Sequence, residues 1–245
     1  DPMIVQDCVS QSDDDGQTWI HRLITQQVKD DHTPGIFASS GMGGLVTHGP
    51  FARRLLHTFN ARRGKELMGV LAYSDDHGDT WKLGATIPGG NESAVIGLPD
   101  GSILVHSRST PFRTVGRSYD GGVTLEDVHQ HPELPDPSDN GSLCLLSSGA
   151  VICTHNHDSD LRRRTVVKKS YDGGKTWPET AVLAPGSSAY STACELRDGS
   201  IGVLFERNGY AEMVFARVYE HDFAPTPAAL PVEADKDGVE FIVAV

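Results

Sequence analysis

Apolar and polar residues alternate in three similar segments of the chain, each with a tight turn at its centre. In the first, residues 93–98 and 102–107 flank a Pro-Asp-Gly turn, a pattern that predicts a β-hairpin. The same arrangement recurs at residues 142–154, around Ser-Ser-Gly, and at residues 192–205, around Arg-Asp-Gly. The three turn glycines lie 48 and 50 residues apart, so the hairpin belongs to a repeating unit.

A second motif, Ser-x-Asp-x-Gly-x-Thr-Trp, occurs four times, and we call it the Asp box. Its copies span residues 12–19, 74–81, 118–125 and 170–177, with Leu125 in place of the tryptophan in the third. The Asp side chain can accept backbone N–H bonds two residues on, and Gly adopts a positive φ without steric cost, so the motif favours a turn. Thr and Trp then favour the start of a strand. We therefore assign the Asp boxes to folding rather than to chemistry.

Hairpins and Asp boxes alternate along the chain. The starting serines of the boxes lie 62, 44 and 52 residues apart, and a box falls between each successive pair of turn glycines. Each unit therefore consists of a hairpin, a connecting loop and a second hairpin whose turn is the Asp box. Four strands in a unit of this length are typical of a β-propeller blade. We predict an all-β fold with four to five blades in 245 residues.

The remaining segments fill in the propeller. Further strands are predicted at residues 20–26, 55–60, 68–74 and 213–220, the last of which would close the ring. Residues 1–5 suggest a short strand close to the first box, so a preceding pair of strands is expected to be either missing or unseen. A proline-rich stretch begins at Pro225 and is expected to be a linker or tail. The propeller domain is thus placed at residues 1–223, and a C-terminal tail or closing segment at 224–245.

Counting strands separates the two faces of the propeller. Two strands lie between each Asp-Gly turn and the next Asp box, so both kinds of turn emerge on one face and the open ends of the hairpins on the other. Glu92 with Arg108, and Tyr190 with Glu206, lie eight residues on either side of the aspartate of their turn, at the open end. Arg162 lies in the loop that leads to a third strand. We predict that these five residues converge on the open-end face.

The chemistry of these residue types suits an anionic ligand and a nucleophile. Two arginines near the axis would clamp a carboxylate by forked hydrogen bonds that lysine cannot copy. A glutamate beside a tyrosine could take the phenolic proton, whose reference pKa of about 10 is too high for a nucleophile near neutrality. The alternative, that each residue is a solvated strand-end residue, stays open here. The matched spacing of the two pairs weighs against it.

Composition narrows the function classes. Lys and Arg total 21 against 33 Asp and Glu, a net charge of -12, which argues against nucleic acid or an anionic membrane as the main partner. No apolar run approaches 18 residues, so no membrane span is predicted. No charged-then-apolar leader is present, so the protein is either cytoplasmic or has a signal peptide outside this sequence.

Cysteine and histidine residues are assigned no special chemistry. Four cysteines do not make a disulfide scaffold in a chain of this length. Cys144 and Cys153 lie symmetrically about the Ser-Ser-Gly turn and could face each other, but buried free thiols are the preferred interpretation. His155 and His157 superficially suggest a metal site, yet no third His or Cys stands at a suitable spacing. No metal and no cofactor are expected.

From Asp1 to about Phe223 the chain resembles the bacterial exo-α-sialidases (neuraminidases), which are six-bladed β-propellers with Asp boxes. The shared motifs are Asn-Glu at 91–92 with an arginine sixteen residues after the glutamate, and three arginines at 162–164 ahead of the fourth box. Ala-Tyr-Ser at 189–191 with Phe-Glu at 205–206 completes the set. The resemblance implies a six-bladed propeller of the sialidase type.

The resemblance also implies roles for the residues that match its motifs. Tyr190 would be the nucleophile and Glu92 its base. Arg108 and Arg162 would be two of the three arginines that hold the carboxylate of sialic acid, and Glu206 would orient the third.

Two departures from the family pattern matter for function. The family's first arginine and its acid/base aspartate lie in an N-terminal blade ahead of the segment that residues 1–5 resemble, and these 245 residues contain no counterpart of either. About one blade and the hairpin before the first Asp box are thus unaccounted for. If both residues are absent from the protein, activity should be severely reduced, because the leaving group has no acid. Within the arginine run, Arg163 and Arg164 are alternatives to Arg162.

The implied function is retaining hydrolysis of terminal α-linked sialic acids on glycans or glycoproteins, by a protein that is secreted or lies at the cell surface. A neutral tyrosine suits this substrate, because the anomeric carbon carries a carboxylate that would repel a carboxylate nucleophile. Two alternatives stay open: a sialic-acid-binding propeller without catalysis, and a hydrolase or transferase acting on a related 2-keto acid sugar. Linkage preference and oligomeric state are open as well.

Overall fold

The structure is a computed structural model that describes residues 6–29, 35–227 and 240–244. Antiparallel β-sheets make up most of it, so the predicted all-β class is confirmed. Helical structure in the described residues is limited to α1 (Thr25–Val28) and the 3-10 turn η1 (Glu220–Asp222). No helix in this part of the chain is long and apolar enough to cross a membrane. The strand predicted at residues 1–5 lies outside the described residues.

The strands form successive sheets along the chain. The first sheet contains β1 (Cys8–Gln11) and β2 (Ile20–Leu23). The second contains β3 (Gly35–Ala38), β4 (Gly44–Leu45), β5 (Leu55–Arg63), β6 (Glu66–Ser74) and β7 (Lys82–Pro88). The third contains β8 (Ser93–Gly97), β9 (Ile103–Ser107), β10 (Phe112–Ser118) and β11 (Glu126–Pro135). The last contains β12 (Ser142–Leu145), β13 (Val151–Asn156), β14 (Arg163–Ser170), β15 (Glu179–Glu195), β16 (Ile201–Arg207), β17 (Glu212–Val218), β18 (Ala224–Pro225) and β19 (Glu240–Ala244).

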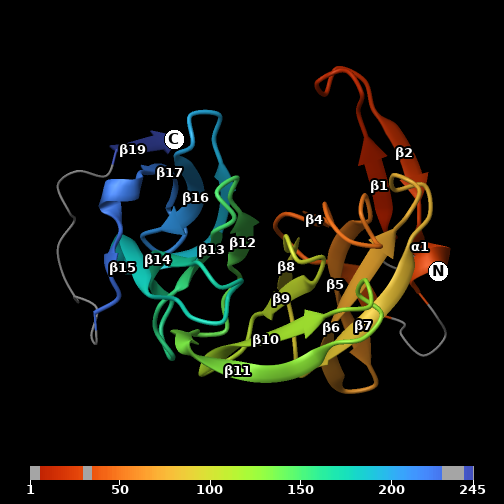
Figure 1. Cartoon of the computed structure of the whole chain (residues 1–245), viewed down its shortest axis with the longest axis horizontal. Helices are drawn as coiled ribbons and strands as arrows, with labels where there is room; N and C mark the ends of the chain where they lie inside the picture. Colours follow the sequence, from red (N-terminus) through yellow and green to blue (C-terminus); the bar gives the residue numbers. More distant parts are fainter. Residues whose placement is uncertain (1–5, 30–34, 228–239, 245) are drawn as a thin grey trace.

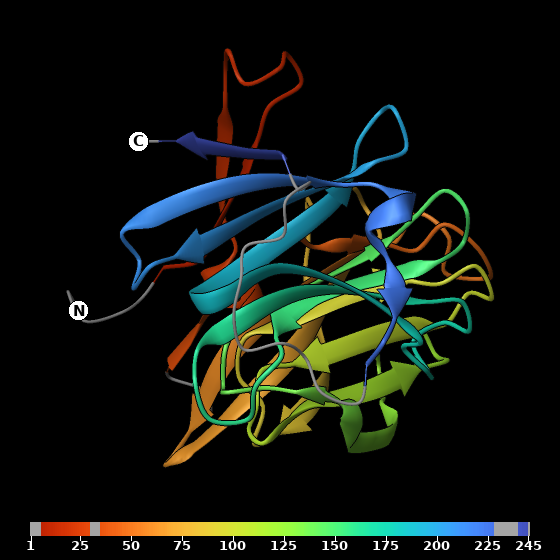
Figure 2. The ribbon, with the colours of Figure 1, turned by 90° about the vertical axis from the view of Figure 1, so that its left-hand side faces the viewer.

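The last sheet consists of two blades that share the long strand β15. The first half of β15 pairs with β14, and its second half pairs with β16. The two units are therefore β12-β13-β14-β15 and β15-β16-β17-β19. Figure 1 shows the sheets side by side in an arc, from β1 and β2 through β8 to β11 and on to β17. In both overall views the β1–β2 hairpin projects beyond the other sheets (Figures 1 and 2).

All three predicted hairpins form, and the alternating residues of their two strands pair with each other. Val95 pairs with Val105, and Ala193 with Val203. Two predicted strands end early: the one at 20–26 stops at Leu23, where α1 follows, and the one at 213–220 stops at Val218, before η1. That second strand does not lie at the sheet edge, because β19 pairs outside it. β18 and β19 thus join part of the 224–245 segment to the sheets, and the boundary at 223 stays a prediction.

The cysteines are free, as the sequence indicated. On the β12–β13 hairpin, Cys144 pairs with Ile152, and Cys153 pairs with Leu143. Neighbouring residues of a strand point to opposite faces, so the two thiols cannot face each other. Cys153 is fully buried, whereas Cys144 is partly buried.

The four Asp boxes share one hydrogen-bond pattern. In the fourth, the Ser170 hydroxyl donates to Asp172 Oδ1 and accepts from Gly174 N–H, both at 2.8 Å. Asp172 accepts the backbone N–H and the hydroxyl of Thr176, at 3.0 and 2.7 Å. The same bonds recur in the other three copies. The prediction that the aspartate binds the N–H two residues on was wrong, because the serine hydroxyl takes that N–H and the aspartate caps residues further on.

The apolar core lies between neighbouring blades. Trp177 of the fourth box is fully buried and packs in one cluster with Leu98 and Leu104, from the β8–β9 hairpin of the adjoining sheet, and with Leu143 of its own sheet. Burial of a side chain of this size contributes strongly to the packing of one blade on the next. The propeller face that carries the Asp boxes, called the box face below, therefore has a structural role. Polar side chains lie at the open ends of the strands, on the opposite face.

Candidate active site

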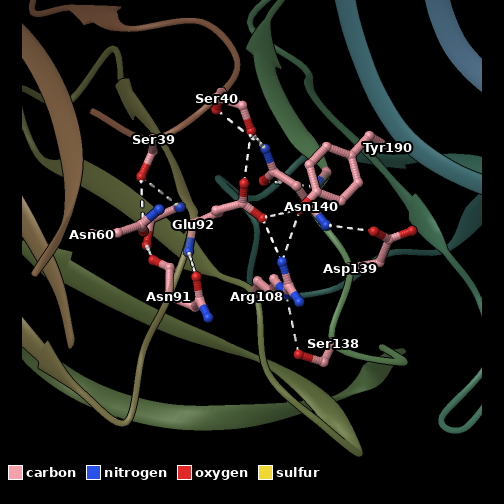
Figure 3. Close-up of polar contacts among 12 residues, drawn as sticks. Ser39, Ser40, Asn60, Asn91, Glu92, Arg108, Ser138, Asp139, Asn140 and Tyr190 are labelled. Carbon is pink, nitrogen blue, oxygen red and sulfur yellow. Dashed lines mark hydrogen bonds and ion pairs between the residues drawn. The ribbon is translucent and has the colours of Figure 1, made fainter. Parts of the chain in front are cut away.

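Glu92, Arg108 and Tyr190 meet in one hydrogen-bonded cluster (Figure 3). The Tyr190 hydroxyl donates to Glu92 Oε2 at 2.5 Å. Arg108 Nη1 donates to the same carboxylate oxygen at 2.6 Å and to the Tyr190 oxygen at 2.8 Å. The Glu92 and Arg108 side chains are only 13% and 20% exposed, so water screens their ion pair less than it screens a surface pair. The phenol is thus held between a carboxylate that can take its proton and a cation.

Local backbone structure explains how these side chains come together. Glu92 precedes β8 and Arg108 follows β9, and the Arg108 N–H donates to the Glu92 carbonyl at 2.9 Å. The hairpin therefore places the two side chains next to each other. Tyr190 lies in β15 where the pairing with β16 shifts between Ser188 and Ser191. Such a bulge re-aims side chains, and here the Tyr190 hydroxyl reaches the Glu92 carboxylate.

The environment of Tyr190 keeps its phenol protonated. Burial, followed by the hydrogen bond and the negative charge of Glu92, raises the pKa of Tyr190 to about 12. The nearby positive charges of Arg108 and Arg162 act in the opposite direction. The oxygen is therefore neutral near pH 7, and it would become a stronger nucleophile only if its proton moved to Glu92.

Arg162 is the member of the arginine run that faces Tyr190. Its guanidinium carbon lies 5.5 Å from the centroid of the Tyr190 ring. Arg163 and Arg164 instead approach the Asp158 carboxylate, at 2.6 and 3.6 Å. Of the three arginines, the structure thus brings Arg162 to the cluster.

Glu206 contacts the backbone of Tyr190 and not its hydroxyl. Its Oε2 accepts the backbone N–H of Tyr190 at 3.2 Å, across the open end of the β15–β16 hairpin. Glu206 thus holds the backbone of the tyrosine. Its expected role in orienting a third arginine stays a prediction.

The turn between β11 and β12 contributes residues that the motif spacing did not single out. Ser138 accepts hydrogen bonds from Arg108 and Arg162, both at 3.1 Å, and the Asn140 amide donates to Ser40 Oγ at 2.6 Å. The turn joins the last strand of one blade to the first strand of the next. Strand counting places such a turn on the open-end face, so that signal could have identified it.

A pocket of about 230 Å³ opens beside Tyr190. Ser40, Asn140 and Glu206 are among the residues that line it. The Ser40 hydroxyl donates to Glu92 Oε1 at 3.1 Å, so one residue of the pocket wall is hydrogen-bonded to Glu92, a candidate catalytic residue. A larger cavity of about 480 Å³ lies among β1, β3, β4 and β5, is mostly apolar and shares none of these residues.

Asp139 is a buried carboxyl group behind Arg162. Its Oδ1 lies 3.5 Å from Arg162 Nη1, and its Oδ2 accepts from the Asn156 amide at 3.0 Å. Burial raises the pKa of Asp139 to about 7 and outweighs the lowering by Arg162, while the charge of Asp136 raises it further. Asp139 therefore changes charge near neutrality, directly behind an arginine of the site.

The raised pKa of Asp139 predicts pH-dependent stability. Between about pH 4 and about pH 7 the folded protein retains a proton that the unfolded chain has lost, so the free energy of unfolding falls as the pH rises. Each pKa unit corresponds to about 1.4 kcal/mol. We expect Asp139→Asn, which cannot ionise, to remove this decline. Urea unfolding of both proteins across the pH window measures it, and parallel pH curves would contradict the assignment.

His155 is fully buried, and His157 is half-buried. His155 Nδ1 lies 3.1 Å from the carbonyl oxygens of Pro135 and Asn156, and the two imidazole rings are 5.4 Å apart. Burial lowers the pKa of both rings, that of His157 to about 3, so both are neutral near pH 7. Within the described ranges, no group of three or more His, Cys, Asp or Glu side chains is arranged to hold a metal ion.

Sequence comparison relates the chain to sialidases. A sialidase of Micromonospora viridifaciens is 36% identical over 223 residues, which cover 84% of this chain and 34% of that protein. An anhydrosialidase of Macrobdella decora is 27% identical over 80% of this chain and 29% of its own length. The chain thus spans about a third of the length of these relatives.

Solved structures share the fold. Hadza microbial sialidase Hz136 matches with a TM-score of 0.78 and 24% identity, over 89% of this chain and 44% of that one. The intramolecular trans-sialidase of Ruminococcus gnavus matches with a TM-score of 0.75 and 21% identity, over 90% and 51%. The family model of the BNR repeat-like domain matches residues 3–203. The chain therefore belongs to the BNR repeat-like family and has the propeller fold of the bacterial-type sialidases.

Proposed function

We propose that this protein is a retaining exo-α-sialidase, which removes terminal α-linked sialic acids from glycans or glycoproteins outside the cell or at its surface. The observation that carries the proposal is the 2.5 Å hydrogen bond from Tyr190 to Glu92, within bonding distance of Arg108. The 36% identity to a named sialidase supports the substrate class. Tyr190 is assigned as the nucleophile and Glu92 as its base.

Arg108 and Arg162 are assigned to the carboxylate of sialic acid. Both guanidinium groups lie at Tyr190, Arg108 through a bond to its oxygen and Arg162 over its ring. Two arginines in a partly desolvated site bind a carboxylate strongly and in a defined orientation. They would also concentrate positive potential on the anionic sugar in a protein whose net charge is -12.

The first step forms a sugar–tyrosine bond. The Tyr190 oxygen attacks C2 of the sugar, its proton moves to Glu92, and the bond from C2 to the departing oxygen breaks. The departing oxygen takes a proton from an acid, and we expect the aspartate that the family resemblance places ahead of Asp1 to supply it. Because the phenol is neutral until the proton moves, the sugar carboxylate does not repel it as it would repel a carboxylate nucleophile.

The second step releases the sugar. Water attacks C2 and gives a proton to the conjugate base of the acid, the bond from C2 to Tyr190 breaks, and Tyr190 regains its proton from Glu92. Two displacements at C2 restore the starting configuration. Intramolecular transfer is a second candidate, because the chain is 27% identical to an anhydrosialidase. In that reaction a hydroxyl of the sugar itself would replace water.

The product distinguishes these functions. The complete gene product should be incubated with a sialoside and followed by NMR, while a fluorogenic sialoside reports turnover. Retaining hydrolysis predicts α-sialic acid as the first product. A 2,7-anhydro sugar, the compound bound in a solved leech trans-sialidase structure, would support transfer instead. Binding of sialic acid without turnover would favour a non-catalytic propeller and contradict the proposal.

A further inference from the structure

One residue of the β11–β12 turn bonds to both arginines of the site (Figure 3 shows its contact with Arg108). The Ser138 hydroxyl accepts a hydrogen bond from Arg108 Nε at 3.1 Å, and the Ser138 carbonyl accepts one from Arg162 Nη2 at 3.1 Å. Arg108 follows β9, whereas Arg162 precedes β14. Ser138 therefore links side chains that two different blades supply.

Ser138 has an uncommon backbone conformation. Its φ is 61°, in the left-handed region, where the Cβ of a residue other than glycine is crowded. A conformation of this kind persists only where the surrounding structure determines it, and it is often found at functional sites. In the turn of Ser138, one residue presents both its hydroxyl and its carbonyl to the two guanidinium groups.

Buried bonds hold this turn in place. The Asp139 N–H donates to Asp136 Oδ1 at 2.8 Å. Arg113 Nη1 donates to Asp136 Oδ2 at 2.5 Å and to the Asp139 carbonyl at 3.0 Å. Arg113 and Asp136 are fully buried, so their positions are determined by the core and not by solvent. The turn is thus a fixed support for the arginines that bond to it.

We infer that Ser138 is a positioning residue, which sets the two arginines at the spacing at which they bind one carboxylate. Arg108 uses Nε for Ser138 and Nη1 for Glu92 and Tyr190, while the described residues offer its Nη2 no hydrogen-bond partner, so that Nη2 can bind an anion. Arginine side chains are long, and holding them before the ligand arrives reduces the ordering cost of binding. The inference rests on the proposed function, in which the carboxylate belongs to sialic acid.

The test compares Ser138→Ala with the wild type in the complete gene product. Removing the hydroxyl should raise KM for a sialoside about tenfold, since a lost bond to a charged group has an effect of this size. kcat should change little, because the carboxylate is bound in both the ground and the transition state. Ser138→Gly, which also removes the hydroxyl but relieves the positive φ, should behave in the same way. It keeps the test valid if the alanine variant does not fold.

A second readout separates positioning from a structural role. Inhibition constants are measured for the 2,3-didehydro analogue of sialic acid and for its C1 methyl ester, which lacks the negative charge. Both Ser138 variants should bind the acid about tenfold more weakly and the ester as the wild type does. Ser147→Ala is the matched control, because Ser147 also bonds through its hydroxyl, to Glu195, at a turn on the box face. It should leave both constants unchanged.

Each outcome decides the inference. Equal loss of affinity for acid and ester, or no loss for either, would overturn the positioning role while leaving the proposed function intact. A wild type that neither turns over a sialoside nor binds the acid would overturn the proposed function, and the role of Ser138 with it.

Discussion

Replacing Tyr190 by phenylalanine is expected to lower turnover of a fluorogenic sialoside by about a thousandfold or more, the effect of deleting a nucleophile. The change keeps the aromatic ring under Arg162 and removes only the oxygen that donates to Glu92 at 2.5 Å. Binding of the 2,3-didehydro analogue of sialic acid should be retained, because the arginines stay. Steady-state kinetics and calorimetry measure the two quantities.

Tyr171→Phe is the matched control for this prediction. Tyr171 belongs to the fourth Asp box, is exposed, and donates through its hydroxyl to Glu179 at 2.8 Å. It lies on the box face of the propeller, so its loss should not alter turnover. Unchanged turnover in Tyr190→Phe would remove Tyr190 from the role of nucleophile, whatever the control shows.

Replacing Asp136 by asparagine is expected to lower the free energy of unfolding by about 3–5 kcal/mol, the cost of leaving a buried charge without its partner. The Arg113 and Asp136 side chains are 1% and 0% exposed. The variant would leave the guanidinium charge of Arg113 in the interior, opposite a neutral amide. Urea unfolding followed by fluorescence measures the change.

An exposed ion pair provides the control. Asp79 lies 3.3 Å from Arg22 and its side chain is 66% exposed, so Asp79→Asn should change the free energy of unfolding by less than about 1 kcal/mol. A loss in Asp136→Asn no larger than that of the control would contradict the prediction.

Replacing Arg113, the other member of this ion pair, should destabilise the protein less than replacing Asp136. Burial raises the pKa of Asp136 despite the bond from Arg113. In Arg113→Met the remaining carboxyl group can therefore take up a proton and become neutral, an option that Arg113 lacks in Asp136→Asn. The loss of stability should accordingly be smaller than in Asp136→Asn.

Much of the fold could be predicted from patterns of residues that lie close together in the sequence. The hairpins at 93–107 and 192–205 form because alternation of apolar residues and a turn glycine act within a few residues of each other. The Asp boxes form for the same reason, although the division of hydrogen bonds between Ser170 and Asp172 was not foreseen. The continuous strand β15 was also missed, because its crossing from one blade to the next depends on pairing partners on both sides.

Only part of the candidate site could be predicted from the sequence. Strand counting assigned Glu92, Arg108 and Tyr190 to one face, but it carries no information on which atoms touch. The choice of Arg162 within the arginine run needed the structure, since Arg163 and Arg164 turn to Asp158. Strand counting also assigns the turn of Ser138 to this face, but no motif marks Ser138 within it.

The sequence alone determined the blade repeat, because turns and strands depend on neighbours along the chain, and it determined the identity of the chemical groups at the open ends of the strands. Tertiary structure decided how those groups act together. The bond between Tyr190 and Glu92 joins residues 98 positions apart, and Ser138 joins arginines of two blades. Such contacts, and the burial that moves the pKa of Tyr190 and Asp139, arise only when the blades pack around a common centre.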